Sequence, residues 1–125
     1  MGYLDQWVYF YQGRKPKSKT NFKIKNNESV KCLFYWRLHD KFDIYMDNLY
    51  HEKGGKYEFI NQKVWLSKED ILNLREEILN NKFFYDVFSS YDNEEQKNED
   101  LEFCCLALEK IEQGFQIYYT NEYQF

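Results

Sequence analysis

One stretch decides the fold predicted for this chain: Phe34-Tyr-Trp-Arg-Leu-His-Asp-Lys-Phe-Asp-Ile-Tyr-Met-Asp-Asn-Leu-Tyr-His-Glu-Lys-Gly-Gly55. Its apolar side chains recur at three- and four-residue spacing, which predicts that they share one face of a helix: Phe34, Leu38, Phe42, Tyr45, Met46 and Leu49. Two consecutive glycines, Gly54 and Gly55, predict the end of this helix. Its start is predicted to lie between Ser29 and Asp40. We expect the rest of the chain to cover the apolar face.

Shorter patterns on both sides of this stretch predict the other elements. An aromatic-rich run at 4–11 predicts a strand covered on both faces, and Phe22 and Ile24, which alternate with lysines, predict a short edge strand. Ser67 and Asp70 form a near capping box that begins a helix. The remaining predicted elements are a strand at 57–66, helices at 68–81 and 94–113, a connector at 83–88, a loop at 89–93 and a strand at 115–125.

The order of these elements predicts a single α+β domain over residues 1–125. We expect a small, mostly antiparallel sheet of about four strands, with three helices packed on it. The core is expected to consist largely of rings, because the chain has 12 Tyr and 11 Phe.

The cysteines and the hydropathy of the sequence indicate the cellular compartment of the protein. The three cysteines include an adjacent pair, Cys104 and Cys105, which favours a reducing environment. No signal-peptide pattern opens the chain, and no apolar run has the length of a membrane span. We therefore expect a cytoplasmic protein, in the cytosol of a host cell, that contacts no membrane.

Charge is distributed unevenly around the net value of −4. Residues 1–85 hold 15 basic and 11 acidic groups, whereas residues 86–125 hold 2 basic and 10 acidic groups. The basic groups are dense in the loop and edge strand at 14–25: Arg14, Lys15, Lys17, Lys19, Lys23 and Lys25. Beside aromatic residues, such a run is typical either of nucleic-acid contacts or of a solvated loop. The acidic helix at 94–113 suggests a different hypothesis. Its carboxylates would imitate a phosphate backbone and so block a nucleic-acid-binding protein.

Candidate chemical sites are few. His39, Asp43, Asp47 and His51 repeat every four residues, but only two neighbours could share one metal ion, so we expect a polar helix face and no metal. Cys104 and Cys105 are expected to lie in the core. The five glycines form no phosphate-binding pattern. We expect neither a cofactor nor catalysis.

The chain also resembles a loosely defined group of small proteins of phages and integrated elements. The resemblance rests on Tyr35, Trp36, Arg37, His39, Phe42, Tyr45 and Met46, then Asn48, Leu49, Tyr50, Lys53, Gly54 and Gly55, then Leu66, Ser67, Glu69 and Asp70, and finally Asp100, Leu101, Gly114, Tyr118 and Tyr119. Three features depart from the group: Leu38 replaces a basic residue, Asp43 replaces a second His, and Phe83, Phe84 and Tyr85 lack flanking glycines. The resemblance implies that the protein is encoded by a mobile element and implies no particular reaction. Small proteins encoded there often block host defences.

Three functional hypotheses follow. The first is a non-catalytic, anti-CRISPR-like inhibitor that binds a host protein, such as a member of a nucleic-acid-binding defence complex. Its predicted partner-binding residues are Tyr35, Trp36, Arg37, His39, Glu94, Glu95, Glu99, Asp100, Tyr118 and Tyr119. The alternative is a nucleic-acid or nucleotide binder that uses the cluster Tyr35–Arg37 and the basic residues at 14–25. A small enzyme or metal protein using His39 is the third.

Overall fold

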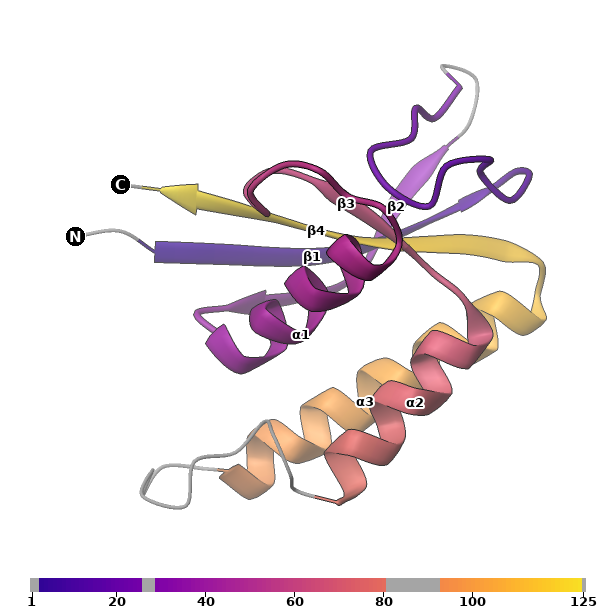
Figure 1. Cartoon of the computed structure of the whole chain (residues 1–125). Helices are drawn as coiled ribbons and strands as arrows, with labels where there is room; N and C mark the ends of the chain where they lie inside the picture. The colour runs from indigo at the N-terminus through magenta and orange to yellow at the C-terminus, as the bar shows by residue number, and fades with distance from the viewer. Residues whose placement is uncertain (1–2, 26–28, 81–92, 125) are drawn as a thin grey trace.

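The predicted α+β fold is confirmed, since the described residues combine an antiparallel sheet with helices packed on it. The structure, a computed structural model, describes residues 3–25, 29–80 and 93–124. Its elements are β1 (Tyr3–Gln12), β2 (Val30–Arg37), α1 (Asp40–Glu52), β3 (Lys63–Leu66), α2 (Lys68–Leu79), α3 (Asn93–Glu112) and β4 (Phe115–Gln124). The strands form an antiparallel sheet in the order β2-β1-β4-β3, and the three helices lie on one side of it (Figure 1).

The two longest strands form the centre of the sheet. β1 and β4 pair along their whole length, from Tyr3 opposite Gln124 to Gln12 opposite Phe115. Alternate residues of β1 are buried, and Val8 joins the main core together with β4 residues Ile117 and Tyr119. Because successive side chains of a strand point to opposite faces, the intervening residues of β1 and β4 lie on the face without helices.

The helices form a second layer over the sheet. α2 and α3 lie side by side, with α1 between this pair and the sheet in the view of Figure 1. The predicted capping box begins α2, since the amide of Asp70 donates to Ser67 Oγ over 3.0 Å and the amide of Ser67 donates to Asp70 Oδ2 over 2.7 Å. The buried face of α2 meets Phe103 and Cys104 of α3 in the main core.

α1 begins at the last position of the range predicted for its start, but the apolar face predicted for this helix is wrong at its first two residues. Residues 34–37 belong to β2, and α1 begins only at Asp40. Phe34 and Leu38 therefore share no helix face, and Leu38 is exposed with a φ of 59°. The end was predicted correctly, because α1 stops at Glu52 and Gly54 has a φ of 102°. Gly55 is required for another reason: a Cβ there would lie 2.2 Å from the ring of Tyr50.

Other boundaries differ in smaller ways. Phe22 and Ile24 form no strand: Phe22 packs under the loop that follows β1, where Thr20 makes an isolated bridge to Val64. The strand predicted at 57–66 is confined to Lys63–Leu66. The predicted connector at 83–88 and most of the loop at 89–93 lie outside the described residues, and Asn93 already belongs to α3.

Candidate functional site

The helix-free side of the sheet carries an exposed group of rings, which we call the open sheet face. It consists of Tyr3, Asp5 and Trp7 from β1 and of Tyr35 and Arg37 from β2. The strand register places Asp5 opposite Arg37 and Trp7 opposite Tyr35. Tyr3 is 39% exposed and Tyr35 is 47% exposed. This surface exists because the residues between them in sequence point the other way, into the core.

Contacts within the open sheet face hold its side chains in place. The Tyr35 hydroxyl donates to Asp5 Oδ1 over 2.5 Å, and this hydrogen bond to a carboxylate raises the pKa of Tyr35. The rings of Trp7 and Tyr35 have their centroids 5.8 Å apart, and the Arg37 guanidinium lies 4.3 Å from the centre of the Tyr3 ring. Ordered Tyr, Trp and Arg side chains are the residues that contribute most binding energy at protein interfaces.

The other half of the helix-free side is covered. The basic loop between β1 and β2 packs Phe22 against Tyr11, Trp65 and Tyr118 in a second apolar cluster. The ammonium groups of Lys15 and Lys19 lie 5.0 and 4.6 Å from the centre of the Trp65 ring. The sheet is therefore open toward the start of β1 and closed toward its end.

A second surface feature, the basic hollow, lies at the closed end. It encloses about 1200 Å³, and the loop after β1, the start of β2, the end of α3 and the start of β4 line it. Its cations are Arg14, Lys15, Lys17, Lys23, Lys25, Lys31 and Lys110, and among the residues that the structure describes no acidic side chain lines it. Five of the six residues predicted to contact nucleic acid line this hollow. The sixth, Lys19, lies over the ring of Trp65.

Five residues predicted to bind a partner are buried. Trp36 is 4% exposed, and its Nε1 donates to Asp100 Oδ1 over 3.0 Å. His39 Nε2 lies 2.8 Å from the other oxygen of Asp100. Tyr118 and Tyr119 are buried on opposite sides of β4. These side chains cannot meet a partner while the fold is intact, so of the predicted ring cluster only Tyr35 and Arg37 remain as surface residues.

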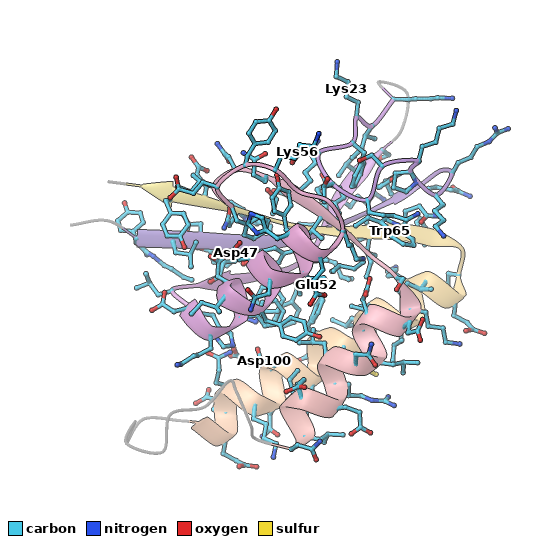
Figure 2. All side chains as sticks on the ribbon, viewed as in Figure 1. Lys23, Asp47, Glu52, Lys56, Trp65 and Asp100 are labelled. Carbon is cyan, nitrogen blue, oxygen red and sulfur yellow. The ribbon has the colours of Figure 1, made fainter. Side chains whose placement is uncertain are left out.

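The predicted acidic surface lies elsewhere. Glu94, Glu95 and Glu99 are exposed on the first half of α3, in the helix layer. In Figure 2, Asp100 lies near the helices, whereas Lys23 lies far from it on the loop beyond the sheet. The structure therefore does not unite the acidic residues, the exposed rings and the basic residues in one site.

A buried polar network accounts for several side chains that looked functional. Asp43 accepts hydrogen bonds from Tyr119 Oη over 2.7 Å, Asn121 Nδ2 over 2.8 Å and Tyr123 Oη over 2.8 Å. Burial raises the pKa of Asp43 despite these donors. Gln6 Nε2 in turn donates to Tyr119 Oη over 2.9 Å. Sequence reasoning missed this network; its signals were a glutamine and an asparagine inside otherwise apolar strands.

The residues considered for metal and thiol chemistry are dispersed. His39 and Asp43 belong to separate buried contacts, while Asp47 and His51 form only a pair with 2.8 Å between Oδ1 and Nδ1. Within the described residues, no three acidic, His or Cys side chains gather where they could hold a metal ion. Cys104 is buried, and burial raises its pKa to about 12. Cys105 is exposed, so its predicted place in the core is wrong.

None of the helices described is both long enough and apolar enough to cross a membrane. Comparison with known proteins gave no match: no protein-family model matches the chain, and no curated protein or solved structure is significantly similar to it.

Proposed function

We propose that this protein is a non-catalytic binding protein that docks a partner protein through its open sheet face. The observation that carries the proposal is the ordered group Tyr3, Trp7, Tyr35 and Arg37 on a sheet whose opposite face is covered by helices. Trp7 is half-buried and the other three side chains are exposed. A rigid sheet can present such rings at low entropic cost, because their side-chain contacts already hold them before binding.

The charges on the open sheet face favour a protein over a nucleic acid there. Arg37 is balanced by Asp5 directly across the strand pair, and Glu122 lies opposite Asp5 on the next strand. A phosphate backbone is bound through an excess of cations. Aromatic rings surrounded by balanced charges instead resemble the centre and rim of a protein interface.

The setting of this activity comes from the resemblance to mobile-element proteins. On that basis we propose that the partner is a host protein, in the first place a member of a nucleic-acid-binding defence complex, and that binding inhibits it. The exposed acidic residues Glu94, Glu95 and Glu99 offer a second contact to such a basic partner. The proposed site of action is the host cytosol.

A capture experiment with matched variants tests docking. Tagged wild-type protein, the double variant Trp7→Ala/Tyr35→Ala and the control Tyr57→Ala are each incubated with bacterial lysate. Tyr57 is 63% exposed and lies outside the open sheet face. We expect wild type and control to retain the same host protein and the double variant, folded by circular dichroism, to lose it. Equal capture by all three would refute docking through this face.

Inhibition is tested separately in cells. Each of the same three proteins is expressed in bacteria that carry one defined defence system, and phage plating efficiency is measured. Wild type and Tyr57→Ala should restore plating against at least one system, whereas Trp7→Ala/Tyr35→Ala should not. Capture of a partner without any effect on plating would leave docking in place and reject the inhibitor role.

A further inference from the structure

We propose that the basic hollow binds the phosphate backbone of single-stranded nucleic acid. This inference goes beyond the proposed function, because it concerns a different surface and a different class of ligand. It requires cations that form no ion pair, a hollow larger than one phosphate, and apolar surface on which bases can lie. Each of these is present.

The first step is the charge of the hollow. Its seven cations come from three parts of the chain: five from the loop after β1, Lys31 from β2 and Lys110 from α3. In the described part of the chain, the ion pairs are His39–Asp100, His51–Asp47 and Lys53–Asp70, and none involves these seven. Within the described ranges, folding therefore gathers cations that form no ion pair, in a protein whose net charge is −4. A polyanion relieves that repulsion.

The second step is the size of the hollow. A volume of about 1200 Å³ exceeds the space that one phosphate group needs, and the lysines and arginine line it along several segments. All the cations except Lys110 are exposed, so their long side chains can reach successive phosphates. A hollow of this size has room for several phosphates.

The third step favours a single strand over a duplex. Phe10 and Phe115 line the hollow with half-buried rings whose centroids lie 5.1 Å apart. Lys110 Nζ lies 4.7 Å from the centre of the Phe10 ring, which places a cation beside this apolar surface. Unpaired bases can stack on aromatic side chains, whereas the bases of a duplex are already stacked on one another.

The hollow is separate from the open sheet face. Tyr11 and Gln12 at the end of β1 line the hollow, whereas Tyr3 to Trp7 at its start belong to the open sheet face. Asp5 and Tyr11 are six residues apart in one strand, a distance of roughly 20 Å. The two surfaces can therefore be altered independently.

The test is a titration of fluorescently labelled oligothymidine, about 20 nucleotides long, followed by anisotropy at about 50 and 200 mM salt. The triple variant Lys23→Glu/Lys25→Glu/Lys31→Glu removes three cations of the hollow. The control, Lys41→Glu/Lys56→Glu/Lys68→Glu, changes net charge equally at exposed lysines elsewhere. All six side chains are exposed, so both variants should fold.

We expect wild type to bind and the hollow variant to bind at least about tenfold more weakly, with the control within about threefold of wild type. If about four phosphates are contacted, the logarithm of affinity should fall with the logarithm of salt with a slope near −3. Trp7→Ala/Tyr35→Ala should bind the oligonucleotide as wild type does, whether or not it still captures a protein.

Four outcomes would overturn the proposal. They are no binding at the lower salt, equal weakening in both triple variants, a duplex bound as tightly as the single strand, and polyglutamate competing as well as unlabelled oligothymidine. Equal weakening in both triple variants would show that binding responds to net charge alone. Competition by polyglutamate would show that the hollow binds polyanions in general.

Discussion

At the scale of single residues, a few buried polar groups determine how the chain turns. Gln6 lies on the central strand β1 and bonds both backbone groups of His39: its Oε1 accepts from the His39 amide over 2.8 Å, and its Nε2 donates to the His39 carbonyl over 3.0 Å. In this way one side chain pairs with the backbone at the junction where β2 ends and α1 begins. Several residues behind the resemblance to mobile-element proteins, including Trp36, Tyr50 and Tyr119, are likewise interior.

Replacing Gln6 tests this junction. Gln6→Leu leaves the amide of His39 without its acceptor and removes one of two donors to the His39 carbonyl, which still accepts from the Asp43 amide. The free energy of unfolding should therefore fall by about 1–3 kcal/mol. Chemical denaturation measures the change. Gln113→Leu, at an exposed position, serves as the control and should change stability by less than about 0.5 kcal/mol. A Gln6→Leu protein as stable as the control would contradict the assigned role.

Asp43 predicts a defined pH dependence. Because burial raises its pKa in the folded state above the ordinary value of 3.8, the folded protein binds this proton more tightly than the unfolded chain. The contribution of Asp43 to stability therefore decreases as pH rises from about 3.8 through the higher folded pKa. Relative to Asp43→Asn, wild type should lose stability over that window in denaturation experiments at several pH values. A difference that grows in favour of wild type would contradict this sign.

At the scale of elements, sequence patterns succeeded where the signal was local. The capping box at Ser67 and Asp70 and the glycine after α3, Gly114 with a φ of 92°, lie within a few residues of the ends they determine. The start of α1 was predicted only as a range, from Ser29 to Asp40, because the side chain that contacts its first backbone groups, Gln6, lies 33 residues from His39 in sequence. Aromatic residues 34–36 suited a strand, but their spacing to Phe42 also suited a helix.

Contacts between residues far apart in sequence also limit how well the site could be predicted. Rings at alternate positions of β1 were visible in the sequence, but their exposure depends on which face the helices cover. Tyr35 and Trp36 are neighbours of the same chemical kind, yet only Tyr35 is on the surface. The hollow required Lys31 and Lys110 to meet the loop after β1, which no local pattern indicates.

Gly55 provides a prediction for the end of α1. Gly55→Ala would place a Cβ against the buried Tyr50 ring and should destabilise the protein by about 1–3 kcal/mol. In a Tyr50→Ala background the same substitution should have little effect, since the ring it meets is gone. A double-mutant cycle by thermal or chemical denaturation measures the coupling. Additive effects of the two substitutions would show that the ring is not the cause.

At the scale of the whole molecule, the fold separates surfaces of different chemistry. Helices cover one side of the sheet and carry the exposed acidic residues Glu94, Glu95 and Glu99 on α3. The other side is divided between the open sheet face and the loop that leads to the basic hollow. This arrangement allows a partner protein and a nucleic-acid strand to be held at different ends of β1. A protein that acts on a nucleic-acid-binding complex could use both.

Site-specific photo-crosslinking in bacterial cells measures docking through the open sheet face without purification of a complex. A photoreactive phenylalanine derivative replaces Tyr35 in one protein, Tyr57 in a second and Glu95 in a third. The account predicts a crosslinked host protein from position 35 and none from position 57, with position 95 reacting only if the acidic part of α3 makes the second contact. A crosslink from position 57 or 95 with none from position 35 would contradict docking through the open sheet face.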